Sequence, residues 1–139
     1  MRASILYRIS SVLILLFAIG HTLGFRKTDP AWGVDQTLAI LKRTTFFVQG
    51  FHRTYYGFYV GFGLFVTVLL LFTALVAWEL GRLPEDTLAQ LPLITWGLAL
   101  CYAGSLIVCL RYFFMTPIIF SALILLCLVA AAVKARGQH

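Results

Sequence analysis

Histidine, arginine and tyrosine side chains occur in three short clusters along an otherwise apolar sequence. Arginine donates paired hydrogen bonds to carbonyl or phosphate oxygens, and histidine and tyrosine can donate or accept one. Together they suit an amphiphile with a polar head, such as a lipid or a quinone. The candidate ligand-binding residues are His21, His52, Arg53, Tyr55, Tyr56, Arg111 and Tyr112.

The two histidines of these clusters allow a second interpretation. Neutral imidazole is an axial ligand of b-type haem, so His21 and His52 on neighbouring helices would form a redox anchor. A metal site is not predicted, because no carboxylate or cysteine accompanies the histidines. Acid–base catalysis is not predicted either, since no carboxylate lies inside the apolar stretches. We therefore expect a binding or accessory protein rather than an enzyme.

The elements that position these side chains are expected to be membrane-spanning helices. The chain has 139 residues, of which 61% are hydrophobic and 12% are charged, whereas a soluble domain has about 25% charged residues. A soluble domain of this size could not bury so much apolar surface. The composition therefore excludes soluble enzymes, disulfide-rich modules and, despite a formal net charge of +6, nucleic-acid-binding domains. It predicts an integral, multi-pass membrane protein in contact with lipid.

Four stretches reach the length of about 20 apolar residues that a helix needs to cross a bilayer. The connections 81–91 and 111–116 are short, so neighbouring spans must be antiparallel. Gly81 is suited to ending a helix, and Pro92 and Pro117 to starting one. The sequence predicts an all-α, single-domain, antiparallel four-helix bundle over residues 1–139. The spans cover about residues 5–25, 55–78, 92–110 and 117–133.

The long connection between the first two spans shows helical periodicity. Apolar residues recur at Val34, Leu38, Leu41 and Val48, with Lys42 off that face. This spacing predicts an additional amphipathic helix at the membrane interface, over about residues 34–48.

Four spans place both termini and the 81–91 connection on one side, here called side A. The long connection and the 111–116 turn lie on side B, together with all seven candidate residues. Side A carries five basic residues and side B carries six. Because the positive-inside rule needs a clear difference, the orientation stays undecided.

Glycine pairs spaced four residues apart occur near the side B ends of the first two spans. They are Gly20 with Gly24, and Gly57 with Gly61. Such pairs let helix backbones approach closely in lipid. They are expected to bring His21 and His52 to one pocket, or to contact a second copy or another membrane subunit. A purely structural role in a larger membrane complex is a further alternative.

The sequence resembles a family of small bacterial four-span membrane proteins that are distantly DoxX-like. The resemblance is carried by residues 20–24, 50–63, 111–114 and 117–122. It implies a four-helix membrane fold with a histidine-containing turn and a location in the bacterial inner membrane. DoxX-like relatives are tied to quinone-linked sulfur oxidation and to membrane redox complexes, but no redox motif in this sequence matches theirs residue for residue, so the resemblance carries over the architecture and little else.

Overall fold

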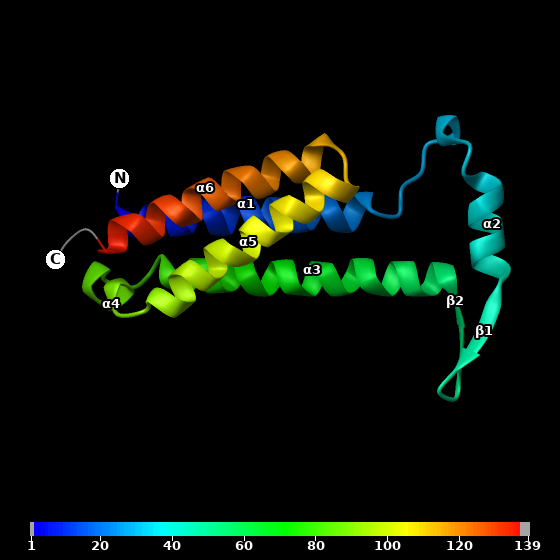
Figure 1. The fold of residues 1–139 in the computed structure, drawn as a ribbon, viewed down its shortest axis with the longest axis horizontal. Coiled ribbons are helices and arrows are strands. Elements are labelled where there is room, and N and C mark those ends of the chain that lie inside the picture. Colours follow the sequence, from blue (N-terminus) through cyan, green and yellow to red (C-terminus); the bar gives the residue numbers. More distant parts are fainter. Residues whose placement is uncertain (1, 137–139) are drawn as a thin grey trace. The chain divides into compact units, whose positions relative to one another are not determined.

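A computed structural model describes residues 2–136 of the chain, and most of these are helical. Four helices are long and apolar enough to cross a membrane, as the sequence predicted. They start or end within three residues of the predicted bounds. In chain order the elements are α1 (Ala3–Gly24), the 3₁₀ helix η1 (Pro30–Trp32), α2 (Asp35–Arg43), β1 (Thr45–Val48), β2 (Phe51–Thr54), α3 (Tyr55–Leu80), α4 (Glu85–Ala89), α5 (Pro92–Tyr112) and α6 (Met115–Arg136) (Figure 1).

The chain divides into two compact units. The first, here called the bundle unit, contains residues 2–18 and 70–136, and so includes most of α1, the end of α3, and all of α4, α5 and α6. The second, here called the arm unit, contains residues 19–69, with η1, α2, the two strands and the beginning of α3. The helices α1 and α3 each continue from one unit into the other.

The core of the bundle unit is built from small and branched apolar side chains. Ile14, Ala77, Ile124, Leu128 and Ala131 are fully buried. Small side chains at helix contacts let the backbones approach closely, which is how packing stabilises helices in lipid. The bundle therefore gains its stability from close van der Waals contact along α1, α3, α5 and α6.

Hydroxyl groups connect α3 to two other helices of the bundle unit, both at the level of Thr73 and Ala74. Ser11 Oγ of α1 donates to the carbonyl oxygen of Ala74 in α3 at 2.7 Å. The hydroxyls of Thr73 in α3 and Tyr102 in α5 lie 3.0 Å apart. Each such bond satisfies a polar group that lipid cannot solvate. The contacts match an antiparallel order of neighbouring helices.

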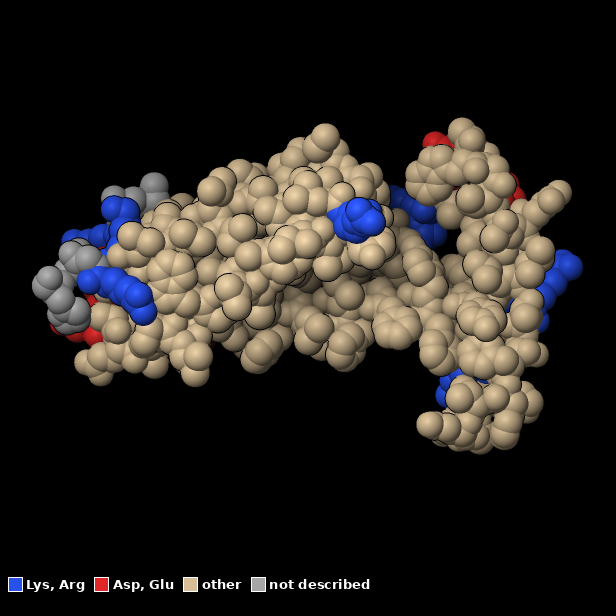
Figure 2. Space-filling view, in the orientation of Figure 1, with Lys and Arg blue, Asp and Glu red and all other residues tan. Residues whose placement is uncertain are grey.

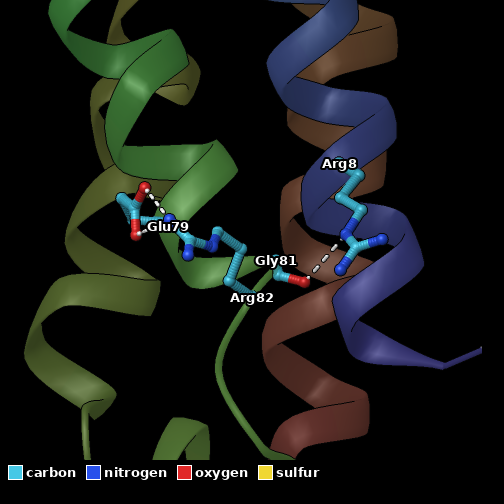
Figure 3. A network of polar contacts seen from close by, with 4 residues as sticks. All are labelled: Arg8, Glu79, Gly81 and Arg82. Carbon is cyan, nitrogen blue, oxygen red and sulfur yellow. Dashed lines mark hydrogen bonds and ion pairs between the residues drawn. The ribbon is translucent and has the colours of Figure 1, made fainter.

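Arg8 and Gly81 fix the end of α3 against α1 in the bundle unit (Figure 3). Arg8 Nε donates to the carbonyl oxygen of Gly81 at 3.0 Å, which satisfies a carbonyl beyond the last turn of α3. A Cβ atom added at Gly81 would lie 2.7 Å from Arg8 Cγ and 3.0 Å from the Ser4 carbonyl oxygen. Gly81 is not among the positive-φ residues. This glycine is thus required for close approach, not for a left-handed helix end.

The predicted interfacial helix over residues 34–48 is corrected by the structure. The helix α2 ends at Arg43, and residues 45–54 form an antiparallel hairpin of β1 and β2. The two turn residues, Gln49 and Gly50, have φ angles of 47° and 88°, as a tight two-residue hairpin turn requires. Aromatic and β-branched residues then favour strands over a continued helix. Only the first part of the predicted helix is helical.

The predicted contact between the two glycine pairs is also corrected. Within residues 19–69, a Cβ added at Gly20, Gly24 or Gly61 would meet no atom within 4 Å, and one added at Gly57 would meet only Thr54. The close approach occurs at Gly63 instead, where an added Cβ would overlap the ring of Phe25. The ring of Phe25 packed against Gly63 therefore takes the place of the expected contact between the two glycine pairs.

The surface of the long helices is almost wholly uncharged. On the face drawn in Figure 2, most lysine, arginine and acidic side chains gather near the helix ends. Large apolar side chains such as Leu126 and Val68 are exposed in the middle of their helices. Apolar side chains exposed along a helix of this length are typical of contact with lipid.

Candidate functional site

The seven residues predicted to bind a ligand divide between the two units. His21, His52, Arg53, Tyr55 and Tyr56 belong to the arm unit, whereas Arg111 and Tyr112 end α5 in the bundle unit. The candidate site is therefore described as two separate groups. The arm group has the denser set of contacts.

The hairpin of the arm unit places His52 and Arg53 on opposite faces, because successive side chains of a strand alternate. His52 is paired with Phe47 on β1, and their ring centroids lie 5.1 Å apart. The guanidinium carbon of Arg53 lies 4.8 Å from the ring centroid of Phe51. Arg53 Nη1 also donates to the carbonyl oxygen of His52 at 2.8 Å. The two residues therefore cannot act together on one small headgroup.

The beginning of α3 adds two tyrosines to the arm group. Thr54 caps this helix, since its Oγ1 accepts a hydrogen bond from the backbone N–H of Gly57 at 2.9 Å. Tyr55 packs against Phe46 with ring centroids 4.9 Å apart. The Tyr56 ring lies beneath the ammonium group of Lys42, 4.9 Å from its centroid. The cap and the hairpin together fix the positions of the two tyrosine side chains in the first turn of α3.

His21 joins α1 to α3 inside the arm unit. Its Nε2 lies 2.9 Å from the carbonyl oxygen of Gly63, and because a carbonyl can only accept, Nε2 must carry the proton. The ring stacks on Phe25 with centroids 5.1 Å apart, and the backbone oxygen of Phe25 accepts from the Tyr59 hydroxyl. Beside it, the hydroxyls of Thr22 and Thr67 lie 3.0 Å apart. These contacts give His21 a positioning role between the two helices.

The haem hypothesis stays a prediction. Because Nε2 of His21 donates to the carbonyl oxygen of Gly63, only Nδ1 of this ring could bind an iron atom. His52 lies on the exposed hairpin against Phe47. Within residues 2–136 there is no group of three or more histidine, cysteine, aspartate or glutamate side chains that could hold a metal ion.

Arg111 and Tyr112 line a shallow groove along the end of α5 in the bundle unit. The groove has a volume of about 390 Å³, and its other lining residues are Ile107, Val108 and Leu110. Both polar side chains are exposed. A cation and a phenol at the end of an apolar strip are suited to the interface between lipid tails and headgroups.

Two cations that the sequence interpretation did not select belong to the arm group. Arg26 lies over the Phe25 ring at 5.4 Å, and Lys42 lies over Tyr56 at 4.9 Å. Arg26 directly follows Phe25 in the sequence, and this adjacency could have predicted their cation–π contact. Lys42 and Tyr56 are far apart in sequence and were brought together only by the hairpin.

The cations of the arm unit are not neutralised by acids. Residues 19–69 contain five lysines or arginines and two aspartates, a net charge of +3. The one salt bridge in the described part of the chain joins Arg82 to Glu79 at 3.0 Å in the bundle unit (Figure 3). Asp29 accepts from the backbone N–H of Ala31 at 2.9 Å and caps η1. The arm unit therefore presents unpaired positive charge beside exposed aromatic rings.

Comparison with known proteins gives no relative for this chain. No family model, no curated protein and no solved structure matches it.

Proposed function

We propose that the protein is a small integral membrane protein whose arm unit binds the headgroup of a lipid-like or quinone-like amphiphile. The observation that carries this proposal is the set of three cations held over aromatic rings without an acidic partner. They are Arg26 over Phe25, Lys42 over Tyr56 and Arg53 over Phe51. The rings favour the membrane interface, where aromatic side chains are enriched.

A cation held over a ring keeps most of its hydrogen-bonding capacity. The guanidinium group has five N–H donors, and Arg53 uses one of them on the carbonyl oxygen of His52. The interaction with a ring contributes only about 0.5–1 kcal/mol at an exposed site. An anionic oxygen can therefore bind Arg53 while the ring still orients the side chain.

The charge of the arm unit favours a lipid-like headgroup over a quinone-like one. A phosphate or carboxylate carries the negative charge that complements a net charge of +3, whereas a quinone offers only neutral carbonyl oxygens. A quinone would instead depend on donors such as the hydroxyls of Tyr55 and Tyr56. The two ligand classes therefore predict different effects of charge removal.

The test uses Trp32, which lies in the arm unit and is 63% exposed, as a fluorescent reporter. Trp78→Phe and Trp96→Phe remove the other two tryptophans. The purified protein is placed in nanodiscs that contain phosphatidylglycerol or phosphatidylcholine brominated near the headgroup, and quenching of Trp32 is measured. One cation near an anionic surface contributes about 1 kcal/mol, so Arg53→Gln is expected to reduce the preference for phosphatidylglycerol about five-fold.

His52→Gln is the matched control, because it changes the neighbouring residue on the opposite face of the hairpin. It is expected to leave the lipid preference unchanged. Equal quenching by the two lipids in the unsubstituted arm would refute the proposal. Quenching by a short-chain ubiquinone that persists in Arg53→Gln and is lost in Tyr55→Phe would assign the arm to a quinone-like ligand.

A further inference from the structure

A second groove lies in the bundle unit, between α5 and α6. Its volume is about 610 Å³, within the range of roughly 300–1,000 Å³ typical of ligand pockets. The side chains of Leu93 and Leu100 on its rim are 86% and 75% exposed. Gly97 of α5 and Leu125 and Val129 of α6 also line it. The groove is thus an apolar channel that is open along one side.

One end of this groove carries polar groups of the kind found at the membrane interface. Arg136 and Trp96 line it there, and the guanidinium carbon lies 5.6 Å from the centroid of the indole ring. Trp96 Nε1 is buried and has no hydrogen-bond acceptor among residues 2–136. Tryptophan and arginine at helix ends mark the level of lipid headgroups. The tail of a lipid bound here would extend from this end toward Ala103.

The length of the groove matches one leaflet of a bilayer. Along α5 it runs from Pro92 to Ala103, which is about 16 Å at 1.5 Å per residue. Half of a hydrocarbon core of about 30 Å is about 15 Å. An acyl chain with its headgroup at Arg136 therefore fits the groove without reaching the opposite leaflet.

The charge at this end is available to an anionic headgroup. The helix α4 packs against α5 and α6 and carries two acidic residues, Glu85 and Asp86. Glu85 of α4 accepts from the backbone N–H of Ala3 at 3.3 Å. Neither Glu85 nor Asp86 forms an ion pair with Arg136, since the described residues contain only the salt bridge between Arg82 and Glu79. Among residues 2–136, Arg136 has no negative partner, and a phosphate would supply one.

We propose that the groove between α5 and α6 binds one acyl chain of an anionic phospholipid, with Arg136 contacting the phosphate. This site lies in the bundle unit and does not depend on the function proposed for the arm unit. It combines an apolar channel one leaflet long with a single unpaired cation at its interfacial end.

The experiment uses Trp96 as its reporter, after Trp32→Phe and Trp78→Phe remove the other tryptophans. Quenching is measured in nanodiscs that contain phosphatidylglycerol or phosphatidylcholine with brominated acyl chains. Phosphatidylglycerol is expected to bind about five-fold more tightly, the factor that one arginine contributes near an anionic headgroup. Arg136→Gln should bring this ratio to about one.

Filling the groove provides an independent variant that keeps the helix intact. A Cβ at Gly97 would meet no atom within 4 Å, so Gly97→Leu should fold and occupy the space of the acyl chain. It is expected to weaken quenching by both lipids. Gly104→Leu is the matched control, because Gly104 is equally open but does not line the groove. It should leave the quenching unchanged.

Three results would overturn this proposal. Equal quenching by the two lipids would show that Arg136 does not contact the phosphate. Unchanged quenching in Gly97→Leu would show that no acyl chain occupies the groove. Absence of quenching by either lipid, together with a doubled mass in native mass spectrometry, would show that a second copy of the chain covers the groove. Because Trp96 reports on the bundle unit and Trp32 on the arm unit, either proposal can fail alone.

Discussion

Replacing Gly81 by alanine is expected to destabilise the bundle unit, although glycine-to-alanine substitutions commonly stabilise proteins. The added Cβ would lie 2.7 Å from Arg8 Cγ and 3.0 Å from the carbonyl oxygen of Ser4, where ordinary contacts are 3.4–4 Å. Ser4 contributes a backbone atom of α1, so the helix itself must shift. Such a shift also lengthens the hydrogen bond of 3.0 Å between Arg8 and the Gly81 carbonyl.

The magnitude follows from three opposing effects on the free energy of unfolding. Overpacking costs about 1–3 kcal/mol, and weakening a hydrogen bond from a charged donor costs up to about 1.5–3 kcal/mol. The reduced freedom of the unfolded chain returns about 0.4–1 kcal/mol. The sum of these ranges is centred on a net loss of about 2–3 kcal/mol, which corresponds to a fall in Tm of roughly 6–9 °C for a chain of this size.

The assay follows the reaction of a thiol-reactive fluorophore with Cys109 during heating in detergent. Cys109 is buried in the bundle unit, whereas Cys101 is exposed and Cys127 half-buried, so Cys101→Ala and Cys127→Ala leave one reporter. Gly104→Ala is the control, because its Cβ would meet nothing within 4 Å and alanine favours a helix by about 1 kcal/mol. If Gly81→Ala melts at or above the parent temperature, the close approach of α1 and α3 is refuted.

Three further substitutions test contacts in the two units. Ser11→Ala removes the bond of 2.7 Å to the Ala74 carbonyl and should cost about 0.6 kcal/mol, the average for hydrogen bonds between membrane helices, by unfolding in sodium dodecyl sulfate. Gly50→Ala forces a side chain to a φ angle of 88° and should cost about 1–2 kcal/mol, seen as faster amide exchange across the hairpin. Thr54→Ala removes the cap at Gly57 and should cost about 1 kcal/mol, with Thr54→Ser restoring it; unchanged exchange at Gly57 would contradict the cap.

The four spans could be predicted from the sequence because lipid leaves the backbone few alternatives. A segment that crosses a bilayer must satisfy its own hydrogen bonds, so a long apolar run is a helix. Pro92 begins α5 as expected. The region from Val34 to Val48 lacks this constraint, because it lies between the spans. In that region the turn at Gln49 and Gly50, with its positive φ angles, makes residues 45–54 a hairpin. The helical spacing of apolar residues does not reveal such a turn.

The sequence selects candidate site residues, but it does not show which way their side chains point. His52 and Arg53 are neighbours in the sequence, and only the strand β2 sends their side chains to opposite faces. His21 was selected as a ligand-binding residue, but whether an imidazole meets a ligand or a backbone carbonyl depends on the neighbouring helix. Gly63 belongs to neither glycine pair, and its contact with Phe25 depends on where a distant ring lies.

The partner of each cation is a better guide to function than the number of cations on each side of the membrane. Arg8 is engaged by the Gly81 carbonyl, and Arg82 is engaged by Glu79, so their charges already stabilise the fold. Arg53 and Arg136 lie over the rings of Phe51 and Trp96, and Arg53 also donates to the carbonyl oxygen of His52, but among the described residues neither forms a salt bridge with a carboxylate. A count of basic residues treats all four arginines alike and favours neither side. In our two proposals, the lack of a carboxylate partner at Arg53 and Arg136 among the described residues, and not the number of cations, favours an anionic headgroup.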